Sequence, residues 1–380
     1  MEKNNSMVGP KAYIHTDRLV NNYKVISQHI GGVPVMAIVK ANGYGHGAVG
    51  VSKVLESAGV NFFGVFSFNE ALELRANGIR SDVFLLCRLQ SEFLSEAIKY
   101  NITLNLSWPD DLDLLIDYHK SNGNIPKVHI KIDTGMTRLG IPYDRISEVF
   151  KKLAAAPQIN CEGIYSHFAT ADEGDPSYAR YQLNLFNKAL KVAKQNNLKF
   201  KYTHLTNSGA ILNLPEAHFN LVRVGMLLYG AFPSSEVPRE LPIEPVMEFR
   251  APLVMIRKVK AGTYVSYGGK YKTTNDTNIG VIQVGFADGF PRPWYENGYV
   301  VYGGKQYRIA GRVCMDQLIV DFGEDEPQVG SEVLLFGKNG QDKLQAEQIA
   351  EEIDSTVYIL LSAVGGRTER IFLRSEHNPT

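Results

Sequence analysis

Short β-rich runs alternate with amphipathic stretches between residues 34 and 224. The stretches place apolar residues at helical spacing, as in AVGVSKVLESAG and YQLNLFNKALKVAKQNN. The runs predict eight strands, over residues 34–41, 62–67, 82–87, 102–107, 127–133, 161–168, 201–207 and 218–224. Eight β/α alternations predict an α/β fold, a (β/α)8 TIM barrel, with an open doubly wound sheet as the alternative.

The pattern changes after Pro233. The segment SSEVPRELPIEP is rich in proline and is typical of a linker. Beyond it, β-rich runs such as NIGVIQVGF and SEVLLFG are joined by short glycine and aspartate turns, which predicts a mostly β domain. We therefore expect two domains, a barrel over residues 1–237 and a mostly β domain over residues 238–380.

The amino-acid composition limits the kinds of molecule with which the protein is expected to interact. Lysine plus arginine equals aspartate plus glutamate, 40 against 40, so nothing indicates nucleic acid or an anionic membrane. Three widely spaced cysteines argue against a disulfide framework and fit a reducing cytoplasm. The N-terminus carries no signal-peptide pattern, and no apolar run approaches the roughly 20 residues of a membrane helix. We expect a soluble, cytoplasmic enzyme that acts on a small molecule.

The predicted strand KVHIKID carries polar residues at alternate positions. Val128 and the two isoleucines alternate with His129, Lys131 and Asp133. Because helices should cover the outer face, the polar trio is expected to point into the barrel, which branched aliphatic residues ordinarily fill. The trio therefore indicates a site, although a strand with one solvated face is the alternative.

Chemically active residues also follow the other predicted strands. Lys40 ends the apolar run VMAIVK and precedes a glycine-rich turn, and a buried unpaired lysine is costly, so it needs a partner, a shifted pKa or a covalent role. Ser208 and Gly225 follow the last two strands, where barrels commonly bind phosphate. A lysine beside a phosphate site fits a carbonyl cofactor held as a Schiff base, and pyridoxal 5'-phosphate is the obvious candidate.

Several motifs together resemble the alanine racemase family. VKANGYGHGA is similar to its cofactor-binding signature, and KIDTGMTRLG, SHFATAD, TNSG, VRVGMLLYG, VSYGGKY, GFADGFPR and GRVCMDQ are similar to its other blocks, in the same order. One departure is AVGGRTERIF, which stands where an arginine-valine-proline-arginine element is common.

The resemblance implies pyridoxal-phosphate-dependent interconversion of L- and D-alanine, an isomerase activity that supplies D-alanine for peptidoglycan. It also implies a homodimer with shared active sites, in which each second domain contributes to the partner subunit's site. Three alternatives stay open: a racemase of another small amino acid such as serine, a fold-related amino acid decarboxylase, and a non-catalytic barrel that carries the cofactor.

The resemblance also implies roles for two bases. Lys40 would hold the cofactor and act as base on the D-enantiomer, and Tyr267 of the partner would act on the L-enantiomer. A tyrosine with its ordinary pKa of about 10 is a poor base at neutral pH, so it needs a neighbour. In the family this neighbour is a histidine, and the matching residue in this sequence is His167. The family's histidine is linked to an arginine, which matches Arg223. Arg223 would meet the pyridine nitrogen.

The remaining implied roles concern the phosphate and the substrate. Arg138 would reach the cofactor's phenolic oxygen and hold the substrate carboxylate, with Met315 and Asp316 near the substrate. Lys131 would be carbamylated and position Arg138, a task that Asp133 could serve instead. No metal site is expected. The residues implied for the phosphate are Tyr44, Ser208, Gly225, Met226 and Tyr358.

Overall fold

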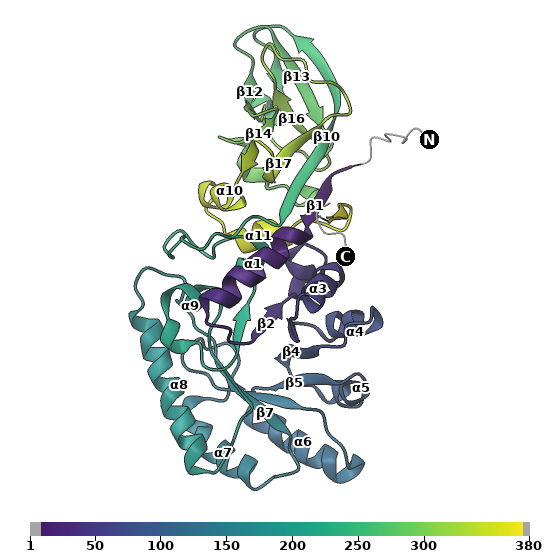
Figure 1. Cartoon of the computed structure of the whole chain (residues 1–380). Coiled ribbons are helices and arrows are strands. Elements are labelled where there is room, and N and C mark those ends of the chain that lie inside the picture. Colours follow the sequence, from purple (N-terminus) through teal and green to yellow (C-terminus); the bar gives the residue numbers. More distant parts are fainter. Residues whose placement is uncertain (1–8, 375–380) are drawn as a thin grey trace.

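The computed structural model describes residues 9–374, so the outermost parts of the two predicted domains, residues 1–8 and 375–380, lie outside it. The described chain forms a helix-covered barrel and a β-rich body that lies beyond one end of it (Figure 1). Within residues 9–374, no helix is both long and apolar enough to cross a membrane.

Eight parallel strands form the barrel, in the order β8-β7-β6-β5-β4-β3-β2-β9. They are β2 Val35–Ile38, β3 Phe62–Val65, β4 Asp82–Arg88, β5 Ile102–Leu106, β6 Val128–Lys131, β7 Cys161–Tyr165, β8 Tyr202–His204 and β9 Val222–Val224. The gap between β8 and β9 is bridged by backbone hydrogen bonds, including one of 3.0 Å from Arg223 N to Thr206 O. Every predicted strand overlaps one of these, and the predicted TIM barrel is confirmed.

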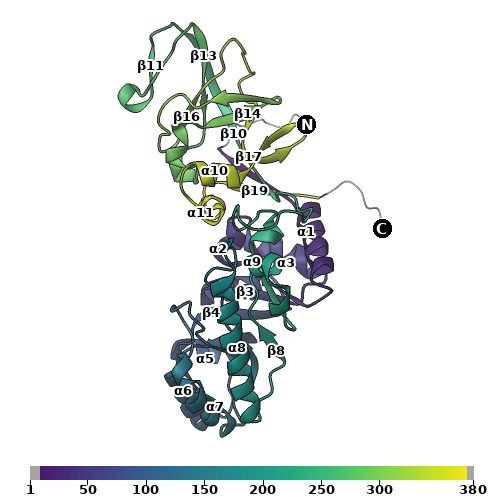
Figure 2. The same cartoon turned by 90° about the vertical axis from the view of Figure 1, so that its left-hand side faces the viewer.

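Helices cover the outer face of the barrel (Figures 1 and 2). On α7, residues Ile146, Val149, Phe150 and Leu153 recur at helical spacing and are buried. The strands beneath are therefore enclosed on both faces, which explains the continuous apolar runs of strands such as β2 and β3. The helices are α1 Thr16–His29, α3 Ala48–Ser57, α4 Phe68–Ala76, α5 Leu94–Lys99, α6 Pro109–Asn122, α7 Ile146–Ala154, α8 Ser177–Gln195 and α9 Ser208–Asn213.

The second body is a sheet of nine strands, which confirms the predicted mostly β C-terminal domain. The strands are β1 Lys11–His15, β10 Met247–Val259, β13 Thr277–Ile282, β14 Tyr299–Tyr302, β15 Lys305–Arg308, β16 Leu318–Asp321, β17 Glu332–Asn339, β18 Asp342–Leu344 and β19 Glu369–Leu373. A separate ribbon pairs β11 Tyr264–Val265 with β12 Tyr271–Lys272, and two helices face the barrel, α10 Ala346–Glu352 and α11 Val357–Ser362.

The first strand, β1, was not expected from the sequence. It pairs antiparallel with β10 and parallel with β19, so it lies in the β-rich body although it precedes the barrel in the chain. Figure 1 shows this purple strand among the green and yellow strands of that body. The predicted division at residue 237 falls in a stretch without helix or strand, between residue 229 and β10.

Candidate active site

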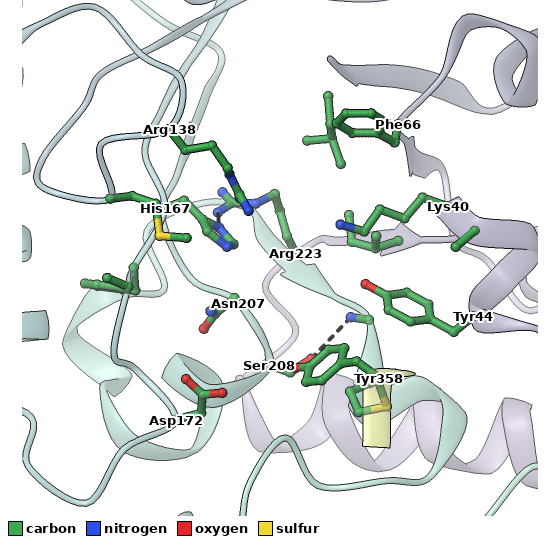
Figure 3. A pocket seen from close by; sticks show the side chains of 18 of the residues that line it. Lys40, Tyr44, Phe66, Arg138, His167, Asp172, Asn207, Ser208, Arg223 and Tyr358 are labelled. Carbon is green, nitrogen blue, oxygen red and sulfur yellow. Dashed lines mark hydrogen bonds between the residues drawn. The ribbon is translucent and has the colours of Figure 1, made fainter. Parts of the chain in front are cut away.

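A cavity of about 790 Å³ opens at the carboxyl ends of the barrel strands (Figure 3). Its volume is within the range of small-molecule and cofactor sites. Most of the residues that the sequence singled out line it, namely Lys40, Tyr44, Lys131, Arg138, His167, Ser208, Arg223, Gly225, Met226 and Tyr358. The strand ends thus bring together side chains that are far apart in the sequence.

Lys40 stands just beyond β2 and opens the short segment α2 Lys40–Tyr44, which is not an ordinary helix. Ala41, Asn42, Gly43 and Tyr44 have φ between 50° and 63°, and Gly45 follows at 81°. Left-handed backbone costs roughly 1–2 kcal/mol per residue that carries a Cβ, so the surrounding structure must hold this turn. We refer to residues 40–45 as the lysine turn.

Hydrogen bonds from several directions hold the lysine turn. Glu70 accepts from the backbone N of Ala41 at 2.7 Å, and the side chain of Asn42 accepts from the backbone N of Ala48 at 2.9 Å. His46 is buried, and its Nδ1 lies 3.1 Å from Gly43 O and 2.9 Å from Tyr44 O, so it donates to both carbonyls. The turn therefore fixes where Lys40 and Tyr44 enter the cavity.

One half of the cavity is lined by hydroxyl groups. The Oγ of Ser208 accepts from Gly225 N at 3.2 Å, and a Cβ on Gly225 would lie only 2.9 Å from Oη of Tyr44. The ring of Tyr44 lies 6.1 Å from that of Tyr358. Burial raises the pKa of both tyrosines, so both hydroxyls remain protonated and can donate hydrogen bonds at neutral pH. This half suits an oxygen-rich anion such as a phosphate.

The other half is rich in cations and centres on Arg223. Its Nη1 donates to Nδ1 of His204 at 2.9 Å, and its Nη2 donates to backbone carbonyls and to Nδ1 of His167 at 3.0 Å. Burial lowers the pKa of Arg223 to about 10, which still leaves it charged at pH 7. Within residues 9–374, no group accepts a hydrogen bond from its Nε. That nitrogen can donate to a ligand.

The same arginine fixes the protonation of two histidines. Burial and the nearby Arg223 charge hold the pKa of His167 well below its ordinary value, so the imidazole is neutral. Since Arg223 can only donate, Nδ1 of His167 accepts and its proton is on Nε2. Behind Arg223, His204 Nε2 lies 2.9 Å from His129 Nδ1, so the predicted inward orientation of His129 is confirmed.

Lys131 lines the cavity as predicted, whereas Asp133 does not. Burial, together with the charges of Arg138 and Arg223, lowers the pKa of Lys131 to about 7. Asp133 lies beyond the end of β6, and its carboxylate accepts from the backbone N of Gly135 and of Thr137. The expectation that Asp133 points into the barrel is therefore wrong: its carboxylate stabilises the following loop.

Three of the predicted site residues lie outside the cavity of their own chain. Tyr267 is 67% exposed and Met315 is 56% exposed, and both belong to the β-rich body, as does the exposed Asp316. None of the three lines the cavity. A single chain therefore brings together the predicted cofactor-binding residues and leaves the predicted second base and the two predicted substrate residues on its surface.

Some residues that line the cavity were not predicted. Asp172 and Asn207 lie inside the motifs SHFATAD and TNSG, and Phe66 is the last residue but one of a predicted strand, so position alone could have indicated them. Asn207 also caps α9, because its side chain accepts from the backbone N of Ala210 at 3.0 Å. Within residues 9–374, no group of three His, Cys, Asp or Glu residues is arranged to hold a metal ion.

Comparisons with known proteins agree over nearly the whole chain. Residues 14–233 match the family model of the alanine racemase N-terminal domain, and residues 246–372 match that of the C-terminal domain. The alanine racemases of Carboxydothermus hydrogenoformans and Desulforamulus reducens are each 37% identical over 95% of this chain, which covers 99% and 98% of those proteins.

A solved structure gives the same result. The crystal structure of alanine racemase from D-cycloserine producing Streptomyces lavendulae superposes with a TM-score of 0.90 at 34% identity, over 96% of this chain and 97% of that one. The family and the amino acid racemase class expected from the sequence motifs are confirmed. This chain belongs to the alanine racemase family.

Proposed function

We propose that the protein interconverts L- and D-alanine with pyridoxal 5'-phosphate in the cavity, and so supplies D-alanine for peptidoglycan. The observation that carries this proposal is the division of the cavity around Lys40 into a hydroxyl-lined half and a cation-rich half. A phosphate, an aldehyde and a ring nitrogen are the three functional ends of this cofactor, and the cavity offers a group suited to each. When bound, the cofactor supplies an electron sink for negative charge at Cα of the amino acid.

The phosphate would lie in the hydroxyl-lined half. Tyr44, Ser208 and Tyr358 offer hydroxyl donors there, and Gly225 and Met226 line the same wall. Gly225 is required because a larger residue would collide with the hydroxyl of Tyr44. In the other half, Nε of Arg223 would donate to the ring nitrogen. An arginine does not give up its proton, so that nitrogen would remain unprotonated.

Lys40 and Tyr267 would move protons on opposite faces of Cα. Burial and the nearby Arg138 charge lower the pKa of Lys40, which favours the neutral amine that a base needs. Tyr267 would come from the partner subunit, and the proton on Nε2 of His167 would hydrogen-bond to its phenolic oxygen. Such a bond would stabilise the phenolate form, which is the form that acts as a base.

The shared site follows from the same proposal. The exposed positions of Tyr267, Met315 and Asp316 support a homodimer in which residues 238–380 complete the site of the partner's barrel, residues 1–237. Arg138 would bind the substrate carboxylate, opposite Met315 and Asp316. We place the enzyme in the cytoplasm, where alanine is available and the cysteines stay reduced.

The test is hydrogen exchange at Cα. Purified protein loaded with pyridoxal 5'-phosphate is incubated with L-alanine in deuterated buffer, and the product is analysed for deuterium and for chirality. We expect deuterated D-alanine together with deuterated L-alanine. Exchange without inversion would contradict the second base, and no exchange with alanine but exchange with serine would contradict the substrate.

A further inference from the structure

The segment 361–370 contains the atypical GGRTER sequence and lies between two parts of the molecule that the proposed function assigns to different sites. We call it the connecting segment. On one side it contacts the lysine turn of its own chain, and on the other it contacts the loop 314–316 that carries Met315 and Asp316. Each contact rests on an arginine of this segment, Arg370 and Arg367.

Arg370 joins the connecting segment to the lysine turn. Its Nε donates to the carbonyl O of Gly45 at 2.9 Å, and its other nitrogens donate to Val364 O, Gly365 O and Thr368 O at 2.7–3.0 Å. The packing is tight, because a Cβ on Gly45 would lie 2.2 Å from Leu361 O. Arg370 thus holds the left-handed turn against the β-rich body, next to Tyr44.

Arg367 joins the same segment to the loop 314–316. Its Nη1 donates to Asp316 at 2.8 Å, and its Nε donates to the buried Asp288 at 3.0 Å. Asp288 also accepts from Gly285 N at 2.9 Å, and a Cβ on Gly285 would lie 2.1 Å from Met315 O. Arg367 therefore fixes the loop from which Met315 projects into solvent.

We propose that both arginines are positioning residues, and that they serve different active sites. Arg370 positions the lysine turn, and hence the cofactor end of the site in its own chain. Arg367 positions the loop 314–316, and hence the substrate end of the site in the partner. The proposal rests on the proposed shared-site homodimer, because only in such a dimer do the two arginines of one chain act on two sites.

The two arginines predict different defects. Arg370→Met removes the hydrogen bond to Gly45 O that holds the lysine turn, together with the three bonds to the connecting segment, so the cofactor should dissociate about tenfold faster and its bound absorbance spectrum should change. Arg367→Met removes the side chain that fixes the loop 314–316, so KM for alanine should rise about tenfold. The absorbance spectrum and the retention of the cofactor should stay as in the parent enzyme. Arg257→Met, at an exposed position on β10, is the matched control and should change neither property.

Mixed dimers test which site each arginine serves. Chains with two different affinity tags are co-expressed, and only dimers that carry both tags are kept. When the arginine variant is paired with Lys40→Ala, the working site takes its barrel from the variant chain. When the arginine variant is paired with Tyr267→Phe, the working site takes Tyr267 and the loop 314–316 from the variant chain.

The expected results are opposite for the two arginines. The Arg367→Met defect should appear in the Tyr267→Phe dimer and disappear in the Lys40→Ala dimer, and the Arg370→Met defect should do the reverse. Asp316→Asn, which alters an exposed side chain, should follow Arg367→Met and serves if that variant folds poorly. If the mixed dimers are active but the defects follow neither pattern, the assignment of the two arginines to different sites is wrong, and the shared-site homodimer still stands. Mixed Lys40→Ala and Tyr267→Phe dimers that form without activity would overturn the shared site, and the inference with it.

Discussion

Nη2 of Arg223 lies 3.0 Å from Nδ1 of His167 and donates to it, so the proton of that imidazole is on Nε2. The bond has two effects. It orients the ring, and it keeps His167 neutral, because a proton on Nδ1 would meet the arginine charge. His167 is therefore a fixed hydrogen-bond donor for whatever group approaches Nε2.

The first prediction concerns His167→Phe. Without the Nε2 donor nothing would stabilise the phenolate form of Tyr267 in the partner's site, and racemisation should fall about a hundredfold. Exchange of the Cα hydrogen of D-alanine, which Lys40 would perform, should continue in deuterated buffer. The double variant with Tyr267→Phe should be no slower than Tyr267→Phe alone, since both changes remove the same base. A further tenfold loss in the double variant would assign His167 another role.

The second prediction concerns the wall between Gly225 and Tyr44. In Gly225→Ala the new methyl carbon would lie 2.9 Å from Oη of Tyr44, so the tyrosine must move away from the phosphate position. We expect the dissociation constant of pyridoxal 5'-phosphate to rise about tenfold, measured by titration of the apoenzyme. Gly366→Ala is the control, because a Cβ there meets no atom within 4 Å. Equal affinity in both variants would contradict the assignment of the phosphate.

A third prediction follows from the lowered pKa of Lys131, about 7. A neutral amine attacks the carbon of dissolved CO2, forms an N–C bond and releases a proton, which leaves a carbamate anion. Among Lys40, Arg138 and Arg223 an anion is stabilised, so we expect Lys131 to be carbamylated. Protein prepared in ¹³C-bicarbonate should show a carbamate carbon signal that is absent in Lys131→Met. No such signal would mean that Lys131 remains an amine beside Arg138.

The fourth prediction is a pH dependence of stability. Burial, with the charges of Lys127 and Arg223, lowers the pKa of His129 from 6.5 to about 3. Between these pH values the unfolded chain binds a proton that the folded chain does not, so His129 makes folding less favourable as the pH falls from 6.5. At pH 5 this amounts to about 2 kcal/mol.

His129→Phe should therefore reduce the loss of unfolding free energy between pH 7 and pH 5, measured by urea denaturation. Phe84→Leu changes the packing against the same ring, at a centroid distance of 4.8 Å, without removing a titrating group. It should lower stability equally at both pH values. An unchanged pH dependence in His129→Phe would show that the histidine takes up its proton in the folded state.

The barrel could be predicted because its physics is local. Most barrel strands contain a short run of apolar residues because both of their faces are covered, and helices with their own periodicity separate the strands along the chain. The strand β1 could not be predicted in the same way. KAYIH is short, and its partners β10 and β19 lie far along the chain. They come beside β1 only in the folded sheet, so the local sequence does not indicate them.

The candidate site likewise has parts that the sequence could predict and parts that it could not. Lys40, His167 and Ser208 follow the ends of barrel strands and Arg223 lies within β9, and the topology of a barrel converts these positions in sequence into a common cavity. The lysine turn is different, because Ala41, Asn42 and Tyr44 favour right-handed backbone, and only the hydrogen bonds around them make the left-handed run acceptable. The prediction for Asp133 was wrong for a related reason. Its carboxylate accepts a hydrogen bond from the backbone of the loop that follows it, and so does not point into the barrel.

The position of β1 also affects how the protein is made. The strand β1 leaves the ribosome before every strand of the barrel, and it pairs with β19, the last strand of the described chain. The barrel can begin to close while synthesis continues, but the sheet of the second body cannot be completed until the C-terminal residues have emerged. During translation β1 must wait with its backbone unpaired, and unpaired strand edges are prone to aggregation. A factor that covers β1 until its partner strands emerge should therefore protect the nascent chain from aggregation.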